Sequence, residues 1–471
     1  MREGTLQLMP NEASTTIPSL SATASEQWHR GKELLVGISP EVGDALLYLG
    51  GAAFALLTIF TSAFPLYQVW GRMAMSPYLF GALASGALAL AVRRARRRRP
   101  DGALSAVQHR RAWWARIAVA ACVFLGALAV PMGLEIFWRF DHVAGSHLQP
   151  EVVAVEKGGQ DIVRGEDPYQ KLVRLHHPVA YHAPGQPYYV GFLPYLPLMA
   201  VAGIPSDVWP NNGLSDARIF FCLTTLVVAA VALALCRAER RRKMRALQAL
   251  IILPLAALPL ATGGDDIPVA AFLLLGVVLA QRRQPFASGV VFGIASAMKF
   301  TAWPLAALAL FAARGRNGER KPLSMLAGMV VIALPTIFPF VLKGPEALVD
   351  DVLLFPLGLS RVPSTAASAL PGHVLVSLFP SLSRVLPLSV GLVLSVLLVR
   401  HLARHTPRTM SSVCNIAGVV LSVLILLAPN PRVGYLLYPI NFFVWAYLVA
   451  EPDDGPEVLP ELTPLTADAT G

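Results

Sequence analysis

The polar stretch that decides the fold reads Gln149-Pro-Glu-Val-Val-Ala-Val-Glu-Lys-Gly-Gly-Gln-Asp-Ile-Val-Arg-Gly-Glu-Asp-Pro-Tyr169 and holds five acidic residues. It separates the apolar run Ile117–Ile136 from a second apolar run. Pro150 suits the first turn of a helix, because its missing N–H is not needed there. The sequence Gly165-Glu-Asp-Pro168 favours the end of that helix, since Gly tolerates left-handed geometry and Pro disfavours helix before it. The stretch therefore predicts a short polar surface helix, with Glu151 at its start, between two membrane segments.

The composition is that of a membrane protein. The chain has 471 residues, of which 55% are hydrophobic and only 14% are charged, and this is too apolar for a soluble globular protein. Its apolar runs approach or exceed the ~20 residues that span a bilayer core. We therefore predict an all-α, polytopic transmembrane helical bundle of about twelve crossings, with re-entrant or juxtamembrane helices on the outer side.

The chain divides into a main membrane domain and three flanking parts. We expect the main domain at 115–450, a disordered tail at 1–44, an extra transmembrane hairpin with a basic loop at 45–114, and an acidic tail at 451–471. The two crossings of the hairpin are predicted at Ala45–Gln68 and Pro77–Val92.

The distribution of the net charge of +10 sets the orientation of the chain. Arginine clusters lie beside apolar runs, which is the positive-inside signature of cytoplasmic loops. This distribution argues against nucleic-acid binding and predicts a cell-membrane protein with both termini in the cytoplasm. Most acidic residues then lie on the extracytoplasmic face. The basic clusters are Arg93–Arg99, Arg110–Arg111, Arg237–Arg245, Arg282–Arg283 and Arg314–Lys321.

One apolar segment, Tyr188–Ile204, does not fit a simple count of crossings. It contains Pro194 and Pro197, and a full crossing here would place Arg237–Arg245 outside, against the charge rule. Either the segment is re-entrant or a later crossing is miscounted. We favour the re-entrant interpretation, because broken helices are tolerated where they line a protein cavity.

Three short apolar segments, 267–280, 286–298 and 301–313, indicate a binding site, since short or interrupted segments often form one in membrane proteins. Asp265 and Asp266 precede the first segment with little loop to solvate them, and charges at membrane depth are costly and usually functional. Lys299 lies between the second and third segments on the outer side. Either it snorkels at a helix end, or it binds an anionic group such as a lipid phosphate.

Glu151 and Arg432 are two further candidates. Glu151 opens a helix just outside the membrane, where it is either a favourable charge at the helix N-terminus or a catalytic carboxylate. Arg432, in the outer loop Asn430–Tyr435, can bind a phosphate bidentately. Among the remaining outer acids, three are expected to be solvated surface: Glu156, Glu166 and Glu346.

Metal ligation is not indicated. His176, His177 and His182 of the outer loop match no metal spacing, so that substrate contact or a structural role is favoured over a metal centre. The four cysteines show neither metal spacing nor a disulfide framework. We therefore expect no cofactor, while a need for a divalent metal is left open.

The order of these motifs resembles a known group of membrane enzymes. Glu151 followed by Gly165-Glu-Asp-Pro-Tyr169, and then by a Tyr- and Pro-rich apolar segment, is similar to the first outer loop of GT-C superfamily glycosyltransferases. The run Gly264-Asp-Asp266, followed by a helix of small residues that ends at Lys299, resembles glycosyltransferase family 87. That family includes polyprenol-phosphate-mannose-dependent mannosyltransferases of actinobacteria. The likeness covers about residues 115–450.

Two positions depart from the pattern of that group. Glu151 stands where Asp is usual, and Val155 stands where Tyr is common. Asp141 is therefore the reserve candidate for the base.

The resemblance implies a GT-C-like enzyme that moves a sugar, mannose by analogy, from a polyprenyl-phosphate donor to a lipid or glycan acceptor on the extracytoplasmic side. It implies that Glu151 takes the proton of the acceptor hydroxyl. Lys299 and Arg432 would stabilise the leaving phosphate. Asp265 or Asp266 would hold acceptor or sugar hydroxyls. Further substrate contacts are expected from Tyr169, Tyr188, Tyr195 and His182.

Two other functions stay open. A secondary transporter would use outer acids and broken helices as a pathway, but it predicts an internal repeat of the hydropathy pattern, which the sequence does not show. A catalytically inactive membrane scaffold is the second, because Glu151 replaces the usual Asp.

Overall fold

The computed structural model describes residues 39–99, 103–169, 193–313, 321–360 and 368–450. Within these ranges every regular element is a helix, which confirms the predicted all-α class.

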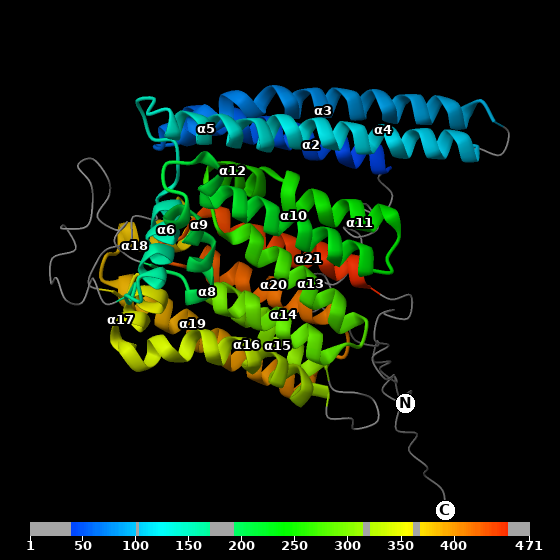
Figure 1. Ribbon diagram of the computed structural model, residues 1–471. Coiled ribbons are helices and arrows are strands. Elements are labelled where there is room, and N and C mark those ends of the chain that lie inside the picture. The colour runs from blue at the N-terminus through cyan, green and yellow to red at the C-terminus, as the bar shows by residue number, and fades with distance from the viewer. Residues whose placement is uncertain (1–38, 100–102, 170–192, 314–320, 361–367, 451–471) are drawn as a thin grey trace, which may run out of the picture.

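The long helices lie side by side in layers (Figure 1). One outer layer consists of α2 (Pro40–Thr61), α3 (Pro65–Arg97) and a continuous helix built from α4 (Ala106–Phe124), the π-helical η1 (Leu125–Ala129) and α5 (Val130–Phe140). The opposite side carries α16 (Lys321–Lys343) and α19 (Leu382–Arg404). Between them lie α10 (Ala217–Leu235), α11 (Arg240–Leu247), η6 (Gln248–Ile252), α12 (Pro254–Thr262), α13 (Asp266–Gln281), α14 (Pro285–Met298), η7 (Phe300–Ala302), α15 (Trp303–Ala312), α20 (Met410–Leu426), η9 (Val433–Leu436) and α21 (Leu437–Val449).

Short helices gather at one end of this bundle (Figure 1). The predicted polar helix is among them as α6, Pro150–Val163, with Pro150 in its first turn and Gly165 at φ +71° just after its end. The others are α8 (Pro197–Ala200), η4 (Val201–Gly203), α9 (Ile204–Val208), η5 (Gly213–Ser215), α17 (Pro345–Val349), η8 (Asp350–Leu354) and α18 (Pro371–Leu378).

The chain is a multi-pass membrane protein. Six helices of the described ranges are long and apolar enough to cross a bilayer: α2, α3, α4–η1–α5, α10, α16 and α19. A seventh is added if the α11–η6 and α12 segments, which meet at a bend of 44°, count as one span. Five further apolar helices are shorter, with 10–17 residues. The predicted twelve crossings therefore stay a prediction.

The predicted boundaries of the first hairpin were wrong. The turn lies at residues 62–64, and Pro77 lies inside α3 rather than at the start of a crossing. α3 tolerates this proline because a proline in a membrane helix can be accommodated by its neighbours. The expected domain boundary at residue 114 falls inside α4, and the division into a hairpin and a main domain stays a proposal.

The segment expected to be re-entrant does not form one long helix where it is described. Residues 197–208 make three consecutive pieces of four, three and five residues. These pieces contact α6, and an added Cβ at Gly159 would overlap the backbone at Gly203. The segment therefore supports the polar helix at the end of the bundle.

α13 is the central helix of the molecule. Twelve of its 16 residues are buried, from Ile267 to Leu279, and it contacts α10 and α14. Its N-terminus carries Asp265 and Asp266 to the end of the bundle where the short helices lie.

Candidate functional site

The centre of the candidate site is an ammonium group between two carboxylates. Lys299 Nζ lies 2.9 Å from Asp265 Oδ1 and 2.6 Å from Asp266 Oδ1. Asp265 is the residue just before α13, and Lys299 follows the last residue of α14. The predicted functional pair and the predicted lysine thus form one cluster, although 34 residues separate Lys299 from Asp265.

The glycine before the aspartates allows this turn to form. Gly263 ends α12 at φ +118°, a conformation that L side chains rarely adopt. A Cβ at this position would also overlap the Val152 side chain of α6. Gly263 therefore lets the start of α6 approach the Asp265–Asp266 turn.

Tyrosines surround the charged cluster. Lys299 Nζ lies 5.1 Å from the ring centroid of Tyr195 and 5.4 Å from that of Tyr435, distances typical of cation–π contacts. The Tyr438 hydroxyl donates a hydrogen bond to Asp266 Oδ1 over 2.8 Å and accepts one from Thr301 over 2.9 Å. These contacts hold the cluster in place from the segment before α8 and from η7, η9 and α21.

Burial shifts the protonation equilibria of the cluster. Asp265 is 1% exposed, and burial together with the neighbouring Asp266 charge raises the pKa of Asp265 to about 6, although Lys299 opposes the shift. Burial disfavours the charged form of Lys299, but the two aspartates outweigh it and hold the Lys299 pKa well above its usual value. Asp265 Oδ2 is buried and has no hydrogen-bond partner within the described chain. The cluster therefore pairs one ammonium group with two carboxyl groups and leaves one buried carboxyl oxygen as an unused acceptor.

Glu151 forms a second charged contact close by. It stands in the first turn of α6 and forms an ion pair with Arg432, which precedes η9. Glu151 is 7% exposed, and its Oε2 atom has no hydrogen-bond partner within the described ranges. Gln149, two residues before Glu151, bonds through its backbone N–H and its side chain to Thr262 of α12. This contact positions Glu151 next to the Gly263–Asp266 turn.

The short turn from Arg432 to Tyr435 links the two charged groups. Arg432 contacts Glu151, whereas Tyr435, three residues later, lies over Lys299. Four segments distant in sequence therefore meet at one end of the bundle, namely the start of α6, the α12–α13 turn, the end of α14 and η9.

The other predicted residues fall into three groups. Tyr195 lies in the cluster, and the Tyr169 hydroxyl donates to its backbone oxygen over 2.7 Å. Tyr169 is fully buried, so that it positions Tyr195, and its contact with substrate stays a prediction. His182 and Tyr188 lie outside the described residues. The reserve base, Asp141, is exposed at the end of α5.

One expectation about the outer acids was wrong. Glu156 was predicted to be solvated, but it is buried and accepts two hydrogen bonds from Arg139, which also contacts Asp216 at 2.6 Å. Asp216 in turn binds Arg218. Burial opposes the charge of Asp216, yet the two arginines lower the pKa of this carboxyl below its usual value. This network connects α5, α6 and α10. The available signal in the sequence was the presence of two arginines, Arg139 and Arg218, at the outer ends of apolar runs, where a buried arginine needs an acidic partner.

Three further residues of the site, Tyr435, Tyr438 and Thr301, were not predicted as site residues from the sequence. Arg432, Tyr435 and Tyr438 are spaced by three residues, so that a helical turn places them on one face. This spacing was the available signal. Within the described residues, no three His, Cys, Asp or Glu side chains come together as a metal site, and transfer without a metal stays a prediction.

The family model for glycosyltransferase family 87 matches residues 192–428, half of the chain. The chain belongs to glycosyltransferase family 87. The family match includes Tyr195, Asp265, Asp266 and Lys299, whereas Glu151 and Arg432 lie outside it. No curated protein and no solved structure matches the chain. Membership in family 87 makes this membrane protein a glycosyltransferase.

Proposed function

We propose that this glycosyltransferase moves a sugar, mannose by analogy with the family it resembles, from a polyprenyl-phosphate donor to a hydroxyl of a lipid or glycan acceptor at the extracytoplasmic face. One observation supports this proposal most. The Arg432–Tyr435 turn joins a carboxylate, Glu151, to the Lys299 cluster at one end of a membrane bundle. A base, cations and hydroxyl acceptors are the groups that transfer from a lipid phosphate needs.

In the proposed reaction the acceptor oxygen attacks the anomeric carbon. The acceptor O–H bond breaks, and its proton goes to Glu151, whose Oε2 is free of protein partners among the described residues. The bond between the anomeric carbon and the phosphate oxygen breaks at the same time. The electron pair stays with the lipid phosphate, whose negative charge the nearby cations stabilise.

Arg432 is better placed than Lys299 to bind the phosphate first. The Arg432 side chain is 37% exposed, whereas that of Lys299 is 4% exposed and already neutralised by two carboxylates. A donor phosphate competes with Glu151 for the guanidinium, because both ligands suit its bidentate geometry. Donor binding would thus release the Glu151 carboxylate for its role as base.

Lys299 enters the proposed mechanism as the second cation. Asp265 and Asp266 accept hydrogen bonds from hydroxyls of the sugar or the acceptor. When one of the two carboxylates turns to a hydroxyl, Lys299 supplies positive charge to the leaving phosphate. Tyr195 and Tyr435, whose rings lie over Lys299, offer surfaces on which a sugar ring can stack.

The outer location of the site is also part of the proposal. α13 begins at Asp266 and ends near Arg282 and Arg283, so that its 16 residues place the acidic cluster about 24 Å from a basic cluster. Basic clusters mark the cytoplasmic side. We therefore place the Asp265–Lys299 cluster outside, in a GT-C-like bundle of about twelve crossings that counts the shorter apolar helices as spans.

A transporter is the less favoured function. Its charged groups would be expected near the middle of the membrane along a pathway, whereas the described site gathers its charges at the end of α12, the start of α13 and the end of α14. A catalytically inactive scaffold would show no sugar transfer, so that the transfer assay distinguishes it from the proposed enzyme.

The proposal is tested with the purified protein in vesicles, a labelled polyprenyl-phosphate mannose and an extract of envelope glycolipids as acceptors. We expect Glu151→Gln to lower transfer by about 100-fold or more, since it cannot take a proton. Glu346→Gln, an exposed acid on α17, is the matched control and should leave transfer unchanged. Full activity of the Glu151 variant would remove this residue from the role of base. Transfer from a nucleotide sugar but not from the lipid donor would refute the proposed donor.

A further inference from the structure

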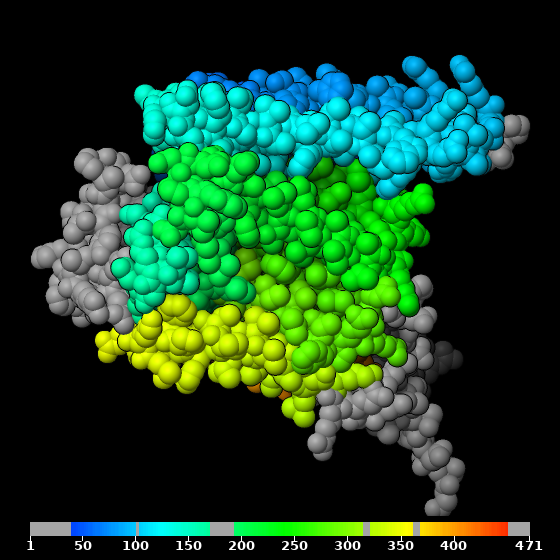
Figure 2. All heavy atoms as spheres, viewed as in Figure 1, coloured from blue at the N-terminus to red at the C-terminus, as the bar shows by residue number. Residues whose placement is uncertain are grey.

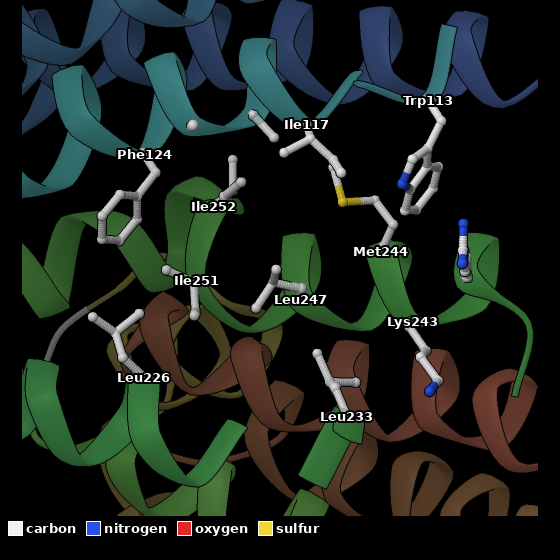
Figure 3. A pocket seen from close by; sticks show the side chains of 13 residues that line it. Trp113, Ile117, Phe124, Leu226, Leu233, Lys243, Met244, Leu247, Ile251 and Ile252 are labelled. Atoms are coloured by element: carbon white, nitrogen blue, oxygen red, sulfur yellow. The ribbon is translucent and has the colours of Figure 1, made fainter. Parts of the chain in front are cut away.

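A groove lies between the outer helical layer and the central bundle. Its volume is about 400 Å³, and Figure 3 shows it between α4 on one side and α10, α11 and η6 on the other. The boundary between α4 and α11 runs along the upper part of the face in Figure 2. Exposed residues on both walls, Ala121 and Arg240, show that the groove opens outward. Apolar side chains line it except at one end, among them Ile117, Phe124, Leu226, Leu233, Leu247 and Ile251.

Two cations occupy the polar end of the groove. Arg240 and Lys243 come from the first turns of α11, and within the described ranges neither side chain has a hydrogen-bond or ion-pair partner. The neighbouring arginines differ in this respect. Arg245 binds Asp44 at 2.6 Å, and Arg242 binds the backbone oxygen of Ala450. Among the cations of α11, the two without protein partners in the described ranges are thus the ones that line the apolar groove, which suits a ligand with an anionic head and an apolar tail.

The length of the groove matches one leaflet. From Arg240 to Ile252 the helix covers about 18 Å, which is somewhat more than half of the ~30 Å hydrocarbon core. The chain then continues through α12 to Thr262, beside the candidate site. The cations of the groove therefore lie at the opposite end of the bundle from Asp265 and Lys299, on the side that basic clusters mark as cytoplasmic.

We propose that this groove binds an anionic phospholipid of the inner leaflet, with an acyl chain along α4 and η6 and its phosphate at Arg240 and Lys243. The ligand is distinct from the sugar donor, because a donor placed for the proposed reaction has its phosphate at the other end of the bundle. Charge complementarity selects the anionic headgroup, and the apolar walls select a lipid over a free phosphate.

A lipid in this position joins two parts of the molecule. One wall of the groove belongs to α4 of the outer layer, and the other belongs to α10, α11 and η6 of the central bundle. Asp44 of α2 binds both Arg116 of α4 and Arg245 of α11 near the same end. This ion-pair network holds the outer layer against the central bundle. The acyl chain of the lipid would extend the same contact along the groove.

The headgroup arm of the test uses charge-matched variants of the full-length protein. Wild type, Arg240→Gln/Lys243→Gln and the control Arg93→Gln/Arg97→Gln on α3 are purified from membranes, and bound phospholipid is counted by native mass spectrometry. We expect wild type and control to retain phosphatidylglycerol and the groove variant to lose it by about tenfold, since its cations are gone. In nanodiscs, replacing phosphatidylcholine by phosphatidylglycerol should raise the Tm of wild type by a few degrees, and that of the groove variant much less. Equal retention of phosphatidylglycerol by all three proteins would overturn the proposal.

The acyl arm leaves the charges untouched. Ala121→Trp fills the groove from an exposed position on α4, and Cys122→Trp adds the same side chain next to it, outside the groove lining. Ala121→Trp should displace the lipid while Cys122→Trp retains it. Phosphatidylglycerol that stays bound to the Ala121→Trp variant would refute the assigned ligand. Equal retention of phosphatidylcholine and phosphatidylglycerol by the wild type would also refute it. If the wild type retains polyprenyl phosphate and the Arg240→Gln/Lys243→Gln variant loses it, the groove is a site for the donor and not for a phospholipid.

Discussion

At the scale of single residues, Lys299 shows how a buried charge depends on its partners. It is 4% exposed, and both its carboxylate neighbours are close enough for direct ion pairs. Removing one partner from such a group leaves uncompensated buried charge, which costs more than the pair itself contributes. The lysine is therefore as important for the stability of the site as for its proposed chemistry.

We predict that Lys299→Met lowers the free energy of unfolding by about 3–5 kcal/mol, because Asp265 and Asp266 then repel each other without a counter-charge. Adding Asp265→Asn to this variant should restore part of the loss, since one of the two charges is removed. Thermal unfolding in detergent measures both effects. Lys157→Met, an exposed lysine on α6, serves as the control and should change little. A double variant no more stable than the single one would contradict the predicted repulsion.

The pKa of Asp265 gives a prediction on pH. Burial, with the charge of Asp266, raises this pKa from 3.8 to about 6 in the folded protein. The folded state thus binds the proton more tightly, so that the contribution of Asp265 to stability is complete below pH 3.8 and is lost as the pH rises through about 6. As the pH rises from about 4 to about 6, the Tm of wild type should fall relative to that of Asp265→Asn.

The same protonation acts in the opposite direction on transfer. The Asp265 carboxylate accepts stronger hydrogen bonds from substrate hydroxyls than the protonated acid does, so that the transfer rate should fall as the pH drops below about 6. Parallel Tm curves for wild type and Asp265→Asn between about pH 4 and 6 would show that the pKa is not raised.

The sequence predicted the residues of the site better than their contacts. Asp265, Asp266 and Lys299 stood out because charged groups are costly at the ends of short apolar segments. Their pairing depends on how α13 and α14 lie, and no local pattern contains that information. The partner of Glu151, Arg432, is 281 residues away. For the same reason the sequence predicts Glu156 to be a solvated acid, whereas its ion pair with Arg139 allows its burial.

At the scale of the elements, the position of Lys299 depends on how closely α14 meets α16. A Cβ at Gly289 of α14 would overlap the backbone of Met325, and one at Gly328 of α16 would overlap the backbone of Phe286. Small residues that allow two backbones to approach are a common basis of helix packing in membranes. Lys299 follows directly after α14, so that this contact also places the ammonium.

We predict that Gly289→Ala costs about 1–3 kcal/mol of stability, because the methyl group must push α14 and α16 apart. Transfer should fall as well, since the end of α14 moves with the helix. The matched control is Gly86→Ala in α3, where nothing lies within 4 Å of the added Cβ. Both variants are compared by thermal unfolding and by the transfer assay. Equal Tm values for the two would rule out the proposed close contact.

The sequence predicted that the elements are helices, but not where each helix begins and ends. The polar helix with Pro150 at its start was predicted correctly, because proline and glycine act on the local backbone. Proline gave a wrong prediction in the first hairpin, where Pro77 lies inside α3 instead of at the start of a helix. There the neighbouring helices decide whether a proline ends a helix, and Tyr78 beside it is fully buried. Tertiary packing overrode the local signal.

At the scale of the whole molecule, charge and apolar surface divide the bundle into two ends. α3 ends in arginines, α11 begins with them, and α13 ends beside Arg282. The other end carries α6, the acidic turn at Asp265 and α17 with Glu346. The proposed transfer at the outer face depends on which of these ends the membrane exposes.

The orientation is tested with single cysteines in intact cells. Glu346→Cys on α17 and Arg97→Cys at the end of α3 are both exposed positions, and Cys122→Ala removes the exposed native thiol. Since basic clusters stay in the cytoplasm, we expect a membrane-impermeant maleimide to label Glu346→Cys at once. Arg97→Cys should react only after the cells are permeabilised. The reverse pattern would place Glu151 and Lys299 in the cytoplasm, where nucleotide sugars are made, and the proposed lipid-phosphate donor would lose its main physical argument.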